Sequence, residues 1–207
     1  MLIVASNSDG HIPAVEAEAT SIALQMETNL RNSGIPHEIT LLSSAEATYD
    51  RVIEALRDGR YHLFHYAGHG RFDDVLPEIS GLVLRHEQGL RTLTAADLRL
   101  LTQDTELRLV YLSCCLGARS AQSVTHGDFH SVMEALALAD VPTVLGFRWS
   151  VRDDASQLMA LVFYQHLWQS FSPGQALLEA RRSAAMGERG RDDETWASPV
   201  LLMQNAG

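Results

Sequence analysis

Short apolar runs alternate with segments of helical periodicity along the whole chain. The runs that predict strands are Leu2–Ala5, Glu38–Leu42, Tyr61–Ala67, Leu107–Cys114, Pro142–Trp149 and Ser198–Met203. Between the third and fourth of these, Gly81–Leu84 and Leu90–Leu93 flank a short polar segment, which predicts a β-hairpin. Strands that alternate with helices are typical of an α/β fold, so we expect a mostly parallel sheet of about six strands with helices on both faces.

The intervening segments carry apolar residues at spacings of three and four, as amphipathic helices do. Val15, Ala19, Ile22, Met26 and Leu30 mark one face of the first helix. Boundary signals accompany the helices. They are Gly34 and Gly59 as stops, Thr94 with Asp97 as a capping box, Asp153 or Asp154 as a cap, and Ser172-Pro173 as an N-cap and N1 pair.

Composition narrows the class of protein. A chain of 207 residues, 46% apolar, can bury one substantial core, so we expect a single domain over residues 1–207. The net charge of −10 comes without a block of Lys or Arg, which argues against direct binding of nucleic acid. No positive n-region and no apolar stretch of about 20 residues is present, so we expect a soluble, cytoplasmic protein without a membrane segment.

The cysteines Cys114 and Cys115 are adjacent in the sequence. Their α-carbons lie about 3.8 Å apart, below the usual disulfide range of roughly 4.4–6.8 Å, so they are not expected to form a structural disulfide. Two sulfurs without a CxxC partner also make a poor zinc site. His126, Asp128 and His130 fit no strong ligand spacing. The sequence therefore predicts no metal and no cofactor.

One histidine and one cysteine lie at the carboxyl ends of predicted strands, where functional residues of α/β proteins are usually found. His69 comes just past the third strand and Cys115 ends the fourth. If these strands are neighbours, their backbones run about 4.8 Å apart at the carboxyl edge, and imidazole and thiol can meet. An imidazole lowers the pKa of a thiol and supplies the reactive thiolate. The N–H groups of Gly70 and Cys115 would then stabilise a tetrahedral oxyanion.

Packing roles compete with this hypothesis. A cysteine in an apolar strand is usually a small core residue, and a histidine near glycines is usually a loop residue with a satisfied hydrogen bond. Cys114 should pack into a helix-covered face, since side chains alternate along a strand. His65 either orients His69 or is a packed, hydrogen-bonded residue. A nucleotide-binding domain is disfavoured because no Gly-x-Gly-x-x-Gly or P-loop motif is present.

Five segments in order resemble the CHAT family, the caspase-like peptidases related to separase. They are Phe64–Gly70, Ser80–Leu84, Leu93–Leu98, Val110–Cys115 and Gly146–Asp153. The first is similar to the family's His-x-Ala-Gly-His-Gly, whose second histidine is catalytic. The fourth resembles Leu-Ser-Ala-Cys, which aligns Cys115 with the nucleophile. The resemblance covers nearly the whole chain.

The resemblance implies a caspase-like three-layer sandwich and a cysteine endopeptidase with a His69–Cys115 dyad. In separase-like relatives the acid of the last segment pairs with a P1 arginine, which implies this role for Asp153 and a pocket wall at Trp149. The alternatives are a helix cap at Asp153 and a core position at Trp149. The family implies a protein substrate, an activating sensor or repeat-domain partner, and a setting in bacterial defence or cell death. A catalytically silent interaction module is the competing function.

Overall fold

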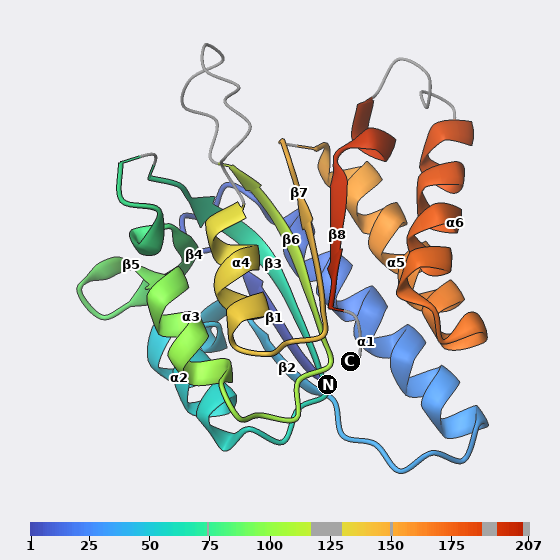
Figure 1. Ribbon diagram of the computed structural model, residues 1–207, viewed down its shortest axis with the longest axis horizontal. Helices are drawn as coiled ribbons and strands as arrows, with labels where there is room; N and C mark the ends of the chain where they lie inside the picture. Colours follow the sequence, from blue (N-terminus) through green and yellow to red (C-terminus); the bar gives the residue numbers. More distant parts are fainter. Residues whose placement is uncertain (74, 117–129, 150, 188–193, 205–207) are drawn as a thin grey trace.

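The computed structural model describes residues 1–73, 75–116, 130–149, 151–187 and 194–204. Its strands form one sheet with helices on both faces (Figure 1). The strands are β1 (Leu2–Ser6), β2 (Thr40–Ser43), β3 (Leu63–Arg71), β4 (Gly81–His86), β5 (Gly89–Thr94), β6 (Leu109–Leu116), β7 (Thr143–Phe147) and β8 (Pro199–Met203). The main path across the sheet is β2-β1-β3-β6-β7-β8.

Helices enclose the sheet and separate two apolar layers. They are α1 (Ala14–Asn32), α2 (Tyr49–Asp58), α3 (Ala95–Thr102), α4 (His130–Leu138), α5 (Asp153–Ser170) and α6 (Pro173–Met186), with 3₁₀ turns Ser44–Glu46, Pro77–Ile79 and Glu194–Ala197. Figure 1 shows α2, α3 and α4 on one face and α1, α5 and α6 on the other. Phe64 and Leu112 belong to the first layer, and Ile3 and Tyr111 to the second. The expected three-layer α/β sandwich is confirmed.

Strand directions agree with the predicted, mostly parallel sheet. β2, β1, β3, β6 and β7 run parallel to their neighbours, and β8 is antiparallel to β7. The expected hairpin is β4–β5, and β4 also pairs antiparallel with the end of β3, through Gly70↔Leu82 and Arg71↔Gly81. At Gly81 an added Cβ would lie 2.0 Å from the Leu93 carbonyl oxygen, so the hairpin leaves no room for a side chain there.

Most predicted boundary signals are confirmed. Thr94 and Asp97 form a capping box at the start of α3, and the Ser172 hydroxyl accepts from the Gln175 N–H at the start of α6. Gly59 ends α2 in the left-handed region at φ 70°. The cap of α5 expected at Asp153 or Asp154 is wrong.

The N-cap of α5 is Arg152, and no side chain makes a capping hydrogen bond there. Asp153 is the first residue of the helix, so it does not cap it. Asp154 instead accepts from Arg152, and its Oδ1 also accepts from the Ala155 N–H at 3.0 Å. An ion pair with the preceding arginine therefore replaces the cap that the acidic residues predicted.

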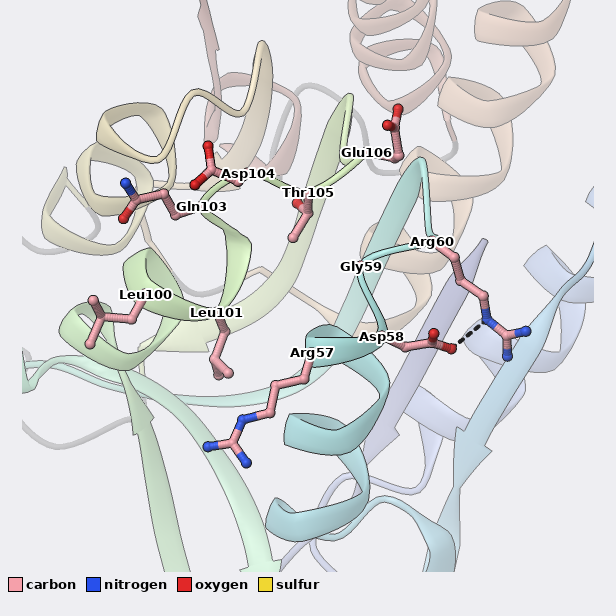
Figure 2. Close-up of a pocket in the computed structure, with 10 residues that line it drawn as sticks. All are labelled: Arg57, Asp58, Gly59, Arg60, Leu100, Leu101, Gln103, Asp104, Thr105 and Glu106. Carbon is pink, nitrogen blue, oxygen red and sulfur yellow. Dashed lines mark ion pairs between the residues drawn. The ribbon is translucent and has the colours of Figure 1, made fainter.

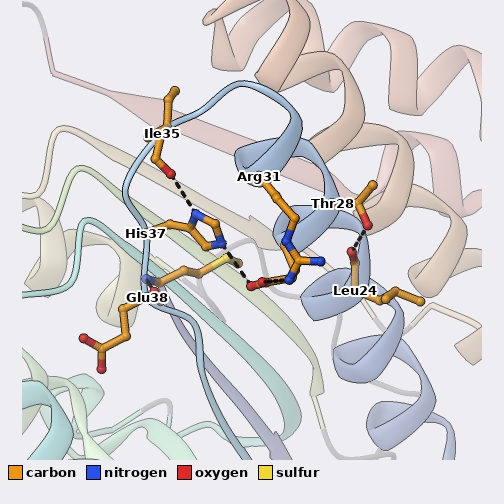
Figure 3. Close-up of polar contacts among 8 residues, drawn as sticks. Leu24, Thr28, Arg31, Ile35, His37 and Glu38 are labelled. Atoms are coloured by element: carbon orange, nitrogen blue, oxygen red, sulfur yellow. Dashed lines mark hydrogen bonds and ion pairs between the residues drawn. The ribbon is translucent and has the colours of Figure 1, made fainter.

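An ionic cluster lies on the connection from α1 to β2, where Figure 3 shows Arg31 and His37. Glu27 pairs with Arg31 at 2.6 Å and with His37 at 3.1 Å. The other ring nitrogen of His37 lies 2.7 Å from the Ile35 carbonyl oxygen. Hydrogen bonding to Arg31, with a smaller contribution from His37, lowers the pKa of Glu27 despite some desolvation. These exposed contacts fix the turn that returns the chain to the sheet.

Within the ranges given above, no helix combines the length and the apolar character needed to cross a bilayer.

Candidate active site

The two residues of the predicted dyad are register partners on neighbouring strands. β3 and β6 pair in parallel from Leu63↔Leu109 to Gly70↔Leu116, and His69 is aligned with Cys115. Aligned residues of adjacent parallel strands lie about 4.8 Å apart. The sheet therefore brings these two positions together through rigid backbone pairing.

Both strands begin two residues later than predicted, at Leu63 and Leu109, and extend further at their carboxyl ends. β3 was expected to end at Ala67 and β6 at Cys114, but they continue to Arg71 and Leu116. Gly70 stays in strand conformation because it pairs with both β6 and β4, and Arg71 because it pairs with β4. His69 is thus the seventh residue within a nine-residue strand and not a loop residue past its end.

The His69 side chain is 25% exposed and lies against Asp9. Its Nε2 is 3.0 Å from Asp9 Oδ2, and the Asp9 side chain is 32% exposed. Beneath them, the Tyr66 hydroxyl lies 2.8 Å from the carbonyl oxygens of both His69 and Val83. Burial raises the pKa of Tyr66 well above its usual value, so this hydroxyl stays a donor. The Tyr66 side chain therefore fixes the backbone of His69, the candidate base.

Gly68 is required for this arrangement. An added Cβ would lie 2.5 Å from the Tyr66 hydroxyl oxygen and 3.0 Å from the Ser6 carbonyl oxygen. The first distance is shorter than real Cβ atoms show, and the second, to backbone, is tighter than most real Cβ contacts. A side chain at position 68 would push Tyr66 away from the His69 carbonyl.

The expected oxyanion donors lie on the same two strands. Gly70 is aligned with Leu116 in β6 and with Leu82 in β4. Cys115 is the last residue but one of β6. The side chain of Cys115 and residues 117–129 lie outside the described part of the structure. The roles of the Gly70 and Cys115 N–H groups stay predictions.

The segment expected to form the specificity pocket follows β7, the neighbour of β6. Trp149 is held there by Ser198, which accepts from its N–H at 3.2 Å and donates to its carbonyl oxygen at 3.0 Å. The Trp149 ring is partly buried against the layer covered by α5 and α6. Asp153 begins α5 at the same end of the sheet, and its side chain lies outside the described part of the structure.

A buried polar network lies below the candidate site. His65 is fully buried, with Nδ1 3.2 Å from the Tyr164 hydroxyl and Nε2 3.1 Å from Glu18 Oε1. Ser156 donates to Glu18 Oε2 at 2.9 Å and lies 2.8 Å from the Ser113 hydroxyl. His65 is thus the packed, hydrogen-bonded residue that one alternative predicted. It links α1 and α5 to the strands that carry the dyad.

One arrangement of protons satisfies every hydrogen bond of this network. Burial, and secondly the nearby Glu18 carboxylate, raise the pKa of Tyr164 well above its usual value. The protonated Tyr164 hydroxyl can donate to His65 Nδ1, which leaves Nε2–H to donate to Glu18. Ser113 then donates to Ser156, because the Ser156 proton is used by Glu18. Every polar group of the network has a partner.

Cys114 packs as expected. It is 2% exposed and belongs to the apolar layer beneath α2, α3 and α4, together with Leu112. Its register partner is Gly68. The two adjacent cysteines therefore occupy different environments, and Cys114 is available as a matched control for experiments on Cys115.

Asp9 was not predicted as a site residue. It lies three residues past β1, in the turn Asn7–Gly10, and β1 is the neighbour of β3 on the side opposite β6. The carboxyl-edge rule that selected His69 and Cys115 applies equally to this turn. The signal was present, but only the strand order identifies β1 as adjacent to β3.

The possible metal ligands His126 and Asp128 lie outside the described residues, as does the side chain of His130. Elsewhere in the described chain, no group of three or more His, Cys, Asp or Glu residues is arranged to hold a metal ion.

Two depressions lie at the opposite end of the sheet, where β3 and β6 begin. One, of about 680 Å³, is lined by the ends of α2 and α3, including Arg57, Asp58 and Asp104 (Figure 2). The other, of about 360 Å³, is apolar and includes Leu167, Trp168 and Phe171. Neither contains His69 or a cysteine, so neither offers a Cys-His pair.

A sequence profile decides the family. The CHAT domain profile matches residues 2–204. The chain belongs to the CHAT family. A comparison with curated proteins returns no significant match.

The fold of this CHAT chain is similar to that of a solved cysteine proteinase. The structure titled as the Arg specific cysteine proteinase gingipain R (RGPB) superposes with a TM-score of 0.60 at 12% identity. The superposition covers 98% of the CHAT chain and 45% of the gingipain chain, so the chain spans less than half of that protein's length. At this identity the likeness shows the fold, which is caspase-like.

Proposed function

We propose that this CHAT chain is a cysteine endopeptidase that uses His69 and Cys115 to hydrolyse peptide bonds in a protein substrate. The observation that carries the proposal is the register His69↔Cys115 at the carboxyl ends of adjacent strands. Membership of a caspase-like family and the matching fold support it.

The reaction follows from ordinary thiol chemistry. The Cys115 S–H bond breaks, its proton moves to the His69 imidazole, and the thiolate attacks the scissile carbonyl carbon. The N–H groups of Gly70 and Cys115 are proposed to hold the oxyanion. The imidazolium then protonates the leaving amine as the C–N bond breaks. Water, deprotonated by His69, hydrolyses the thioester and restores the thiol.

We further propose that the peptidase cleaves after Arg or Lys and that Asp153 contacts this P1 side chain. A carboxylate favours a guanidinium through paired, charge-assisted hydrogen bonds and repels an acidic P1 residue. Trp149, placed between β7 and α5 by its bonds to Ser198, is proposed as a wall of the same pocket.

Removing the charge of Asp153 tests the specificity. In a panel of fluorogenic peptides, we expect Asp153→Asn to lower kcat/KM for P1 Arg by about tenfold to hundredfold, because a hydrogen bond to a charged group contributes about 1.5–3 kcal/mol. Asp154→Asn is the matched control, because it removes the neighbouring exposed carboxylate that pairs with Arg152. It should leave kcat/KM for P1 Arg unchanged. A wild-type preference for P1 Asp would refute the assignment.

The cellular setting remains part of the proposal. We propose a cytoplasmic peptidase controlled by a sensor or repeat-domain partner, in bacterial defence or regulated cell death, as the family resemblance implies. If no peptide or protein is cut and Cys115 is inert toward thiol reagents, the chain is instead a silent caspase-like interaction module.

A further inference from the structure

Asp9 and His69 are in direct contact at the candidate site. Asp9 Oδ2 lies 3.0 Å from His69 Nε2. The Nε2 atom is shielded from solvent and has no hydrogen bond of good geometry in the described chain, so the contact with Asp9 is close but poorly aligned. Catalytic hydrogen bonds are often poorly aligned before substrate binds and tighten in the complex.

The turn that carries Asp9 is itself held in place. Asp9 Oδ1 accepts from the His11 N–H at 3.0 Å, and Asn7 Oδ1 accepts from the Ile12 N–H at 3.0 Å. Gly10 completes the turn in the left-handed region at φ 81°, with its N–H 3.3 Å from the Asn7 carbonyl oxygen. One carboxylate oxygen is therefore fixed by its own loop, and the other faces the imidazole.

The strand order puts the three residues in line. β3 lies between β1 and β6, with Ser6 aligned to Gly68 and His69 aligned to Cys115. Asp9 thus approaches His69 from the β1 side, while position 115 lies on the β6 side. The order of Asp9, His69 and position 115 across the strands is the one in which a third group orients the base of a Cys-His pair.

The charge of Asp9 suits this role. Partial burial raises the pKa of its carboxyl, but the His11 N–H and the His69 ring together outweigh burial and lower it below the usual value. Asp9 is therefore ionised at neutral pH. A carboxylate accepts a hydrogen bond from Nε2–H and stabilises the imidazolium that forms when the thiol is deprotonated.

We propose that Asp9 is a positioning residue of the dyad, which holds the Nε2–H of His69 and leaves Nδ1 to exchange a proton with the Cys115 thiol. The inference rests on the proposed function. In this step the S–H bond breaks and the Nδ1–H bond forms, so that a neutral pair becomes a thiolate and an imidazolium without any oxidant or reductant.

The test is the pH dependence of Cys115 alkylation by iodoacetamide, followed by mass spectrometry, in wild type, Asp9→Asn, His69→Ala and Glu16→Gln. Asparagine keeps the shape of Asp9 and removes its charge. Glu16→Gln removes a charge in the first turn of α1, where Glu16 accepts from the Ser44 hydroxyl, and serves as the matched control. We expect Asp9→Asn to move the alkylation profile to higher pH and to slow the reaction at neutral pH by about tenfold or more. Glu16→Gln should behave as wild type.

The variants separate the two possible failures. A His69→Ala profile that differs from wild type, together with an unchanged Asp9→Asn profile, would overturn the role of Asp9 and leave the dyad intact. An unchanged His69→Ala profile would overturn both. If Asp9→Asn does not fold, ¹⁵N NMR of the wild type still decides, with the His69 signals assigned by their loss in His69→Ala. The proposal requires Nε2–H in the neutral ring, and Nδ1–H would overturn it.

Discussion

Cys115→Ala is expected to abolish cleavage of basic-P1 peptides, with kcat/KM at least about 10⁴-fold below wild type. The substitution removes the atom that would attack the carbonyl carbon, and no other group at the carboxyl ends of β3 and β6 is proposed to replace it. Peptide hydrolysis by equal concentrations of the two proteins measures the effect. Circular dichroism should show the same fold in both.

Cys114→Ala is the matched control for this prediction. Cys114 packs beneath α2–α4, so its loss removes one small buried group and should destabilise the fold by about 1 kcal/mol without affecting the chemistry. Cleavage should therefore persist. If Cys114→Ala is inactive although folded, and Cys115→Ala retains activity, the nucleophile has been assigned to the wrong cysteine.

Glu18→Ala is expected to cause the largest loss of stability, about 3–5 kcal/mol in the free energy of unfolding. Glu18 is 3% exposed and accepts from Ser156, with His65 at 3.1 Å on its other oxygen. Alanine would leave two buried donors without an acceptor, at about 1–3 kcal/mol each, and a cavity between α1 and α5. Urea unfolding followed by circular dichroism measures the change.

The same helix offers a control for Glu18. Glu16 lies two residues earlier and reaches the exposed Ser44 hydroxyl, so Glu16→Ala should change the free energy of unfolding by no more than about 0.5 kcal/mol. Equal, small effects of the two substitutions would mean that the buried network does not hold α1 and α5 to the sheet.

Local signals made much of the fold predictable. The capping box at Thr94, the Ser172-Pro173 start and the Gly59 stop depend on neighbouring residues, which a single sequence contains. The β4–β5 hairpin is local as well. His69 and Cys115 could be chosen because both follow apolar runs and because the family resemblance pointed to them.

The rest depends on long-range pairing. The end of β3 is predicted too early because Gly68–Arg71 has weak strand propensity, and pairing with β1, β4 and β6 keeps it extended. Glu18 lies among the apolar positions of α1, yet its burial follows from partners 47 and 138 residues away. Predicting a role for Asp9 likewise requires knowing that β1 and β3 are neighbours in the sheet.

The most direct test of the account is labelling with a peptidyl-arginyl chloromethyl ketone at neutral pH, mapped by mass spectrometry. An imidazole beside the thiol should make Cys115 react selectively over Cys114, and His69→Ala should slow this labelling by at least about tenfold. Labelling that is absent, divided equally between the two cysteines, or unaffected by loss of His69 would contradict a catalytic pair at positions 69 and 115.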